Sequence, residues 1–256
     1  MIISHNQYLT SHVIANYQIL QTISSIEKIV WRNSRDIDCY GTLITPFTSS
    51  KGLIIYCRGG YGDTHLSLNE LAHSASPIFQ CTKAGYHVLA LEYTGTGGSD
   101  GFESCNGFDQ IADIVDSTKF ALTLGFETAI LIGASRGADA VLLAANTGKC
   151  YISKVIAASG LYDLTTLKAT RPDLYHYISK YISIDEESLK NRSIISSKPV
   201  GLKYIQTILV HGDIDTRSPV SHAYQLSDKL INCPKTLLVY KNMGHRLKVN
   251  WMDLII

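Results

Sequence analysis

The sequence lacks an excess of charge of one sign, a long apolar run and a metal-binding pattern. Its 23 Lys and Arg residues are balanced by 22 Asp and Glu residues, which leaves a formal net charge of +1. Nucleic-acid binding needs clustered Lys and Arg to neutralise phosphates, so no nucleic-acid partner is expected. No segment reaches the roughly 18 consecutive apolar residues of a membrane-spanning helix, so no membrane span is expected either.

Cysteine pairs and cofactor motifs are also missing. The six cysteines are scattered, and none forms a C-x-x-C motif. Several lie in apolar segments, which indicates reduced, buried cysteines in a cytoplasmic protein. The start, Met1–Asn6, does not resemble a secretion signal. Without an H-E-x-x-H motif, a Cys/His cluster or a G-x-x-x-x-G-K motif, we predict no metal and no cofactor.

What the sequence does contain is an alternation of apolar strands and amphipathic helices. Strands that are apolar on both faces and separated by helices are typical of a parallel sheet covered on both sides. We therefore predict an α/β fold with about eight strands, the first two antiparallel. An N-terminal helical extension is expected over residues 1–25, before a single domain at 26–256. The predicted strands are Ile26–Arg32, Ile37–Thr45, Gly52–Arg58, Tyr86–Glu92, Thr128–Ala134, Ile152–Ala158, Thr207–His211 and Thr236–Tyr240, and the predicted helices are Leu66–Ala84, Phe108–Leu124 and Gly137–Ala145.

The region between Tyr162 and Tyr204 breaks this alternation. Its apolar spacing is irregular and it is dense in tyrosine. It follows a strand, at the sheet edge where α/β proteins bind ligands. We therefore predict a small helical cap over residues 162–204 that contributes Tyr162 to substrate binding. The alternative is an ordinary pair of surface helices.

The most informative segment is Gly133-Ala-Ser135-Arg-Gly137, which lies between a buried strand and a helix rich in Ala and Leu. A serine on a sharp strand-to-helix turn exposes its Oγ above the sheet. The following helix directs unpaired N–H groups at the same place, where they stabilise a developing oxyanion. A structural serine in an ordinary turn is the alternative, but the placement favours a nucleophile.

Two later loops carry groups that could activate this serine. Asp213 and Asp215 follow the strand at 207–211, and His245 follows the strand at 236–240. Because the carboxyl ends of parallel strands share one edge, these groups can converge with Ser135, in the order Ser, Asp, His. Taken singly, His245 could be an ordinary loop residue and either aspartate could cap a helix. His211, at a strand end, is interpreted as structural.

These motifs resemble the α/β-hydrolase fold, and within it the prolyl-oligopeptidase-like and dienelactone-hydrolase-like enzymes. Leu209–Val220 is similar to the family segment H-G-x-x-D-x-x-V-P, whose last carboxylate is catalytic, and this resemblance selects Asp215 over Asp213. Asn242-Met-Gly-His245 is similar to the family's closing G-H loop, and residues 84–101 to the strand and glycine loop before the nucleophile. The resemblance covers residues from about Ile26 onward. In a departure from the propeller-bearing peptidases, no propeller is expected, because only about 25 residues precede the first predicted strand.

The resemblance also implies an oxyanion hole. Its donors would be the backbone N–H of Arg136 and one from Gly60 or Tyr61, in the turn after the strand at 52–58. The family peptidases often have a tyrosine where Arg58 stands, so a tyrosine-assisted hole is not implied. Arg58 and Arg136 could instead bind a substrate carboxylate, with solvated or structural roles as the alternative.

Together, these features predict a serine hydrolase that cleaves an ester, thioester or amide of a small-molecule or peptide acyl substrate. Ser135 would attack, His245 would act as base, and Asp215 would orient the histidine. A serine peptidase is the alternative within the same chemistry. A non-catalytic binding protein with the same fold is the alternative outside it. The sequence does not indicate an oligomeric state.

Overall fold

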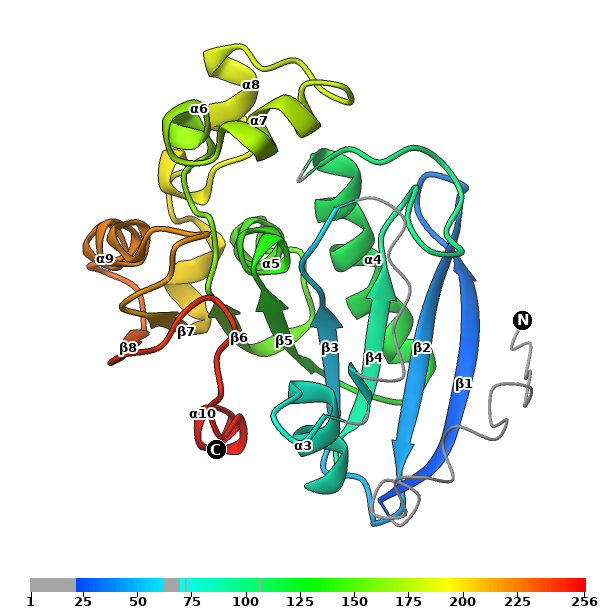
Figure 1. Ribbon diagram of the computed structural model, residues 1–256. Helices are drawn as coiled ribbons and strands as arrows, with labels where there is room; N and C mark the ends of the chain where they lie inside the picture. The colour runs from blue at the N-terminus through cyan, green and yellow to red at the C-terminus, as the bar shows by residue number, and fades with distance from the viewer. Residues whose placement is uncertain (1–21, 62–69, 72, 106) are drawn as a thin grey trace.

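The computed structural model describes residues 22–61, 70–71, 73–105 and 107–256 (Figure 1). Its centre is an eight-stranded sheet of order β1-β2-β4-β3-β5-β6-β7-β8. The pairs β1/β2 and β2/β4 are antiparallel, and all the other pairs are parallel. The predicted fold, the α/β-hydrolase fold, is confirmed. The strands are β1 Ile23–Arg32, β2 Asp38–Pro46, β3 Leu53–Cys57, β4 His87–Glu92, β5 Ala129–Ala134, β6 Ile152–Ala158, β7 Gln206–Gly212 and β8 Lys235–Tyr240.

Side chains alternate along each inner strand and supply a core on each face of the sheet. In β3, for example, Ile55 packs into one core together with helices α4 (Phe108–Thr123), α5 (Arg136–Asn146) and α9 (Val220–Lys229). Ile54 packs into the other core with α3 (Pro77–Lys83) and α10 (Met252–Ile255). Both residues are at most 1% exposed. The uninterrupted apolar runs of the sequence are therefore strands buried on both faces. The helices are α3 Pro77–Lys83, α4 Phe108–Thr123, α5 Arg136–Asn146, α6 Leu167–Thr170, α7 Pro172–Ile178, α8 Glu186–Asn191, α9 Val220–Lys229 and α10 Met252–Ile255.

Two predicted helices differ from the structure where it describes them. The helix predicted over Leu66–Ala84 is wrong in its extent, because residues 73–76 form a turn and α3 starts only at Pro77. Ser76 caps α3 by accepting a hydrogen bond from the Ile78 N–H, and proline is favoured at the first helical position. The N-terminal helical extension falls outside the described residues up to residue 21. Its last predicted part, 23–25, belongs to β1 instead.

Between β6 and β7 the chain forms α6, α7, α8 and three short 3₁₀ helices, η2 Leu164–Thr166, η3 Ile194–Ser196 and η4 Gly201–Tyr204. Figure 1 shows α6, α7 and α8 beyond the carboxyl ends of the parallel strands. This segment packs around a small apolar cluster that includes Leu164, Leu167 and Ile178, together with Cys105 from the loop before α4. The segment therefore packs as a compact unit above the sheet edge.

All six cysteines are unpaired, and all except the half-buried Cys150 are buried. Burial raises the pKa of several of these thiols, including that of Cys81 to about 12, so they are inert core residues. Within the described residues, no helix is long and apolar enough to cross a membrane. The same part of the chain contains no group of three His, Cys, Asp or Glu side chains that could hold a metal ion.

Candidate active site

Ser135 occupies the sharp turn between β5 and α5. Its backbone has φ 54° and ψ −119°, a conformation that non-glycine residues rarely adopt. The turn is tight, because a Cβ at Gly133 would lie 2.2 Å from the Gly137 carbonyl oxygen, and one at Gly137 would lie 2.0 Å from that of Cys57. Both glycines of the G-x-S-x-G motif are thus required by close backbone packing.

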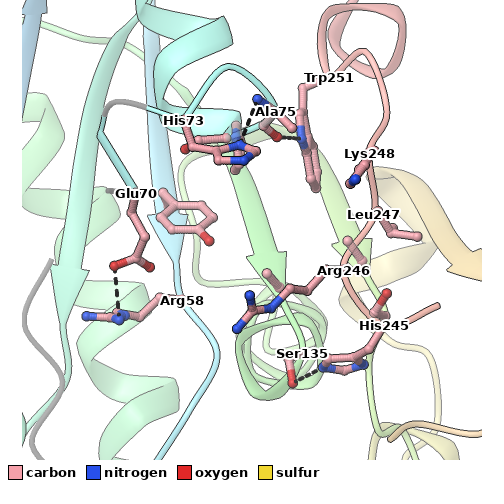
Figure 2. A pocket seen from close by; sticks show the side chains of 16 residues that line it. Arg58, Glu70, His73, Ala75, Ser135, His245, Arg246, Leu247, Lys248 and Trp251 are labelled. Atoms are coloured by element: carbon pink, nitrogen blue, oxygen red, sulfur yellow. Dashed lines mark hydrogen bonds and ion pairs between the residues drawn. The ribbon is translucent and has the colours of Figure 1, made fainter. Parts of the chain in front are cut away.

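The three groups singled out from the sequence form one chain of hydrogen bonds. The Ser135 Oγ lies 3.0 Å from His245 Nε2, and His245 Nδ1 lies 2.8 Å from Asp215 Oδ2. Figure 2 shows the Ser135–His245 contact at the base of a cleft. Asp215 follows β7 and His245 follows β8, so the sheet topology brings together residues that are 110 positions apart.

The surroundings of Asp215 keep its carboxylate ionised. Burial by itself would raise the pKa of Asp215, but hydrogen bonds from His211, from His245 and from the Ser218 N–H outweigh it, so the pKa lies well below its ordinary value. Oδ1 accepts from the N–H groups of Arg217 and Ser218 at 2.8 and 2.9 Å. The second oxygen, Oδ2, contacts His245 Nδ1 at 2.8 Å.

Asp213 and His211 lie outside the chain of hydrogen bonds that joins Ser135, His245 and Asp215. The exposed Asp213 accepts a hydrogen bond from the Met243 N–H at 3.3 Å, so it holds the loop and does not contact His245. His211 is fully buried, with its Nε2 2.9 Å from the Ser218 carbonyl oxygen and 3.3 Å from Asp215 Oδ2. The aspartate that lies beside His245 is Asp215.

The turn after β3 and the start of α5 both lie next to Ser135. A Cβ at Gly59 would be 2.7 Å from the Ser135 Cβ, so the turn after β3 lies directly against the serine. Arg136 is the first residue of α5, and the first N–H groups of a helix have no partner within it. Gly60, at φ 90°, directs its carbonyl oxygen to Arg136 Nη1 at 2.9 Å. This contact fixes the orientation of the Gly60–Tyr61 peptide, and thus of the Tyr61 N–H.

The side chain of Arg136 is fully engaged inside the protein. Its Nη2 lies 2.5 Å from Glu103 Oε1, and both side chains are buried. The guanidinium also lies 4.6 Å from the centre of the Tyr61 ring and 5.0 Å from that of Tyr93. The suggestion that this side chain binds a substrate carboxylate is therefore wrong, and its role is to fix the turn.

A cleft of about 680 Å³ opens in front of Ser135 and His245 (Figure 2). Its described lining comes from β3 and the turn after it, from residues 70, 73 and 75–77, from the ends of β5 and β6, and from residues 245–248 and 251. None of these lining residues belongs to the 162–204 segment. One wall of this cleft is formed by residues that follow His245, namely Arg246, Leu247, Lys248 and Trp251, for which no role was predicted.

The two predicted substrate-binding side chains differ in position. Arg58 lines the cleft, where its Nη2 lies 3.2 Å from Glu70 Oε2 (Figure 2). Tyr162 is 0% exposed, belongs to the core with α5, and donates its hydroxyl hydrogen bond to the Ala157 carbonyl oxygen at 3.1 Å. The prediction for Tyr162 is therefore wrong, because no substrate can reach a side chain packed in the core.

The C-terminal wall is held by a glutamine and a tryptophan. Gln80 accepts from the Trp251 N–H at 2.7 Å and donates to the Val249 carbonyl oxygen at 3.2 Å. The indole N–H of Trp251 donates to the Ala75 carbonyl oxygen at 3.1 Å (Figure 2). Residues 245–251 are thus tied to α3 and its preceding turn. A sign of this wall in the sequence is the alternation of basic and apolar residues after His245.

The sequence pattern of the prolyl oligopeptidase family matches residues 73–252. These 180 positions include Ser135, Asp215 and His245, and they make up more than half of the 256-residue chain. No curated protein matches the chain.

Solved structures share the fold at low sequence identity. An esterase from Pyrococcus furiosus superposes with a TM-score of 0.66 at 17% identity, covering 90% of this chain and 88% of the esterase. The acylaminoacyl peptidase of Pyrococcus horikoshii gives 0.71 at 17% identity, covering 92% of this chain but 40% of the peptidase. A puromycin-hydrolyzing peptidase from Mycobacterium tuberculosis gives 0.67 at 15%, covering 90% and 37%. The chain therefore spans about two fifths of these peptidases and nearly all of the esterase.

Proposed function

The chain belongs to the prolyl oligopeptidase family and is a serine hydrolase, and from this premise we propose that Ser135 is its nucleophile, His245 its general base and Asp215 the carboxylate that orients the base. The observation that carries the proposal is the continuous hydrogen-bonded chain of Oγ, imidazole and carboxylate, with contacts of 3.0 and 2.8 Å. Nucleophile, base and orienting group in mutual contact are the minimum set for acyl transfer.

The proposed reaction begins with proton transfer. The contact to Asp215 favours the tautomer with hydrogen on His245 Nδ1, which leaves the Nε2 lone pair to accept the Ser135 proton. Oγ then attacks the acyl carbonyl carbon, and the tetrahedral intermediate collapses as the imidazolium returns its proton to the leaving group. A water molecule, activated in the same way, attacks the acyl-enzyme and releases the acid.

The oxyanion of both intermediates would be held by backbone N–H groups. We propose the Arg136 N–H at the start of α5 and a second donor from the Gly60–Tyr61 turn. Two observations support this: the turn lies against Ser135, and the buried guanidinium of Arg136 fixes its orientation through Gly60. Donors that are fixed before the reaction stabilise the developing charge without reorganisation, and one such donor is worth about 10²–10³ in kcat.

For the substrate, we propose a carboxylic ester or thioester of modest size, with a peptide amide as the second candidate. The ester is favoured by the match to the P. furiosus esterase over 88% of its length, against about two fifths of each peptidase. The open cleft of about 680 Å³ has room for a small acyl compound and its leaving group. We further propose that residues 162–204 form a helical cap on the domain.

A fluorophosphonate probe followed by peptide mass spectrometry tests the nucleophile. We expect one label per chain, on Ser135, and none on the Ser135→Ala variant, because only an activated serine reacts. Unlabelled, folded protein would instead indicate a binding protein with a hydrolase fold. A panel of esters, thioesters and aminoacyl amides then separates esterase from peptidase. Faster turnover of the amides than of the esters would reverse our order of candidates.

A further inference from the structure

Two basic side chains follow His245 along the wall of the cleft. Arg246 and Lys248 both line it, and both are exposed. Figure 2 shows the guanidinium of Arg246 extending into the cleft near Ser135, toward the side where Arg58 and Glu70 lie. Within the described part of the chain, neither Arg246 nor Lys248 forms an ion pair or a side-chain hydrogen bond. Their charges are thus available to a bound molecule.

The described lining of the cleft is more cationic than the molecule as a whole. It includes Arg58, Arg246 and Lys248 but a single carboxylate, Glu70, and that carboxylate pairs with Arg58. The whole chain has a formal net charge of only +1. The excess positive charge at the cleft is therefore a local feature, and in a concave site such charge attracts anions from solution.

The backbone that carries these cations is fixed relative to the reacting groups. His245 is held at one end by Ser135 and Asp215, and Trp251 is held at the other end by Gln80 and the Ala75 carbonyl oxygen. Arg246 and Lys248 lie between these two anchors. A guanidinium matches carboxylate and phosphate oxygens with two parallel hydrogen bonds, and the lysine adds a second charge.

We propose that the substrate carries an anionic group, a carboxylate or a phosphate, which binds Arg246 and Lys248 while its acyl carbonyl lies at Ser135. This inference rests on the proposed function and narrows it from acyl compounds in general to acidic ones. Simple apolar esters would then be poor substrates, because they leave both cations without a partner. Carboxylate and phosphate share the chemistry that the two side chains recognise, and the experiment distinguishes them.

The test compares substrates of equal length with and without the charge. For an anionic acyl group, 4-nitrophenyl glutarate and its 4-phosphonobutanoate analogue are compared with 4-nitrophenyl pentanoate, after subtraction of spontaneous hydrolysis. For an anionic leaving group, 4-acetoxybutanoate is compared with butyl acetate. In at least one series we expect kcat/KM to be about 10- to 100-fold higher for the anionic compound, since hydrogen bonds between charged groups are strong. The glutarate and phosphonate values show which anion is preferred.

Matched variants identify the side chains responsible. In Arg246→Gln/Lys248→Gln the ratio of anionic to neutral kcat/KM should fall to within about threefold of one. An effect of the substitutions that changes kcat/KM equally for both substrates cancels in this ratio. The control Lys203→Gln/Lys241→Gln removes the same charge from exposed lysines outside the described lining, and it should keep the wild-type ratio. High salt should lower the wild-type preference.

The proposal is overturned if wild-type protein shows no preference for the anion in either series, or if the double variant retains the preference. Failure of the proposed function looks different, because then no ester is hydrolysed and Ser135 takes no label. In that case calorimetry with glutarate and with inorganic phosphate, on wild type and on the double variant, still tests the anion site. Binding that requires both cations supports the site, and equal or absent binding refutes it.

Discussion

Two arginines directly follow the two residues that share the proposed proton, and their surroundings are opposite. Arg136, after Ser135, is buried against Glu103 and close to two tyrosine rings. Arg246, after His245, is exposed on the cleft wall and has no side-chain partner within the described residues. The arginine next to the proposed nucleophile is thus paired inside the protein. The arginine on the cleft wall is not paired by any described side chain, so its charge is available to a ligand.

This contrast shows that position in the sequence does not decide what an arginine does. A guanidinium that is surrounded by protein stabilises the structure, and one that faces solvent in a concavity is available for recognition. Substitutions at the base of the cleft and on its wall test each side of this contrast.

Removal of the proposed nucleophile at the base should have the largest effect. Ser135→Ala is expected to lower kcat by about 10⁴- to 10⁶-fold, because acyl transfer loses its attacking atom. The melting temperature should hardly change, since alanine can keep the same backbone turn. Ester hydrolysis on purified protein and a thermal melt measure both effects. Substantial turnover by a folded Ser135→Ala sample would assign the chemistry to another residue.

Asp215→Asn should have the next largest effect. The amide can present its N–H₂ to His245 and favour the wrong tautomer, and in a comparable triad such a change lowers kcat by about 10⁴-fold. Asp213→Asn is the matched control, because Asp213 is exposed and contacts the Met243 N–H and not His245. If both variants lost activity equally, the assignment of Asp215 would be wrong.

Arg136→Met tests the buried side of the contrast. It leaves Glu103 buried without its cation, so the free energy of unfolding should fall by about 3–5 kcal/mol. Urea unfolding measures this loss. The double variant Arg136→Met/Glu103→Gln should recover part of it, because no unpaired charge then remains. If the double variant were less stable than the single one, the ion pair would not be the cause.

Acid should weaken the contribution of Asp215 to stability. Its pKa is lowered in the folded state, so its contribution is fully present above the ordinary aspartate value of about 3.9 and is lost as the pH falls below it. The stability difference between wild type and Asp215→Asn should narrow as the pH falls from 4 toward 3. Urea titrations of both proteins at each pH measure it. A difference that grew on acidification would contradict the assigned direction.

Arg246→Gln should have the smallest effect on folding. An exposed side chain without partners contributes little, so the free energy of unfolding should stay within about 0.5 kcal/mol of wild type. The same urea assay as for Arg136→Met applies. A loss of more than about 2 kcal/mol would show that Arg246 is a structural residue.

Much of the fold could be predicted from the sequence because the inner strands are buried on both faces. An apolar run such as residues 52–58 leaves few alternatives, and the observed β3, Leu53–Cys57, lies within it. The helix predicted over 66–84 failed for a local reason. The prediction followed the helical spacing of the apolar residues and ran through Ser76 and Pro77. A capping serine followed by proline instead marks the start of a helix.

The candidate site could be predicted only where the chemistry depends on chain order. Ser135, Asp215 and His245 each follow a strand, so the parallel sheet determines their convergence. The roles of Tyr162 and Arg136 could not be derived in this way. A tyrosine in the core and one in a pocket have the same local sequence pattern. The ion partner of Arg136, Glu103, lies 33 positions away in an irregular loop, where no periodicity indicates the contact.

The backbone conformation of Ser135 sets the folding stability of the protein against its proposed chemistry. At φ 54° and ψ −119°, a serine pays conformational strain of about 1–3 kcal/mol that a glycine would largely avoid. Gly in place of Ser135 would therefore give a more robust protein with no hydroxyl to react. The proposed nucleophile thus occupies its position at a cost in stability, which leaves the protein less tolerant of destabilising substitutions elsewhere.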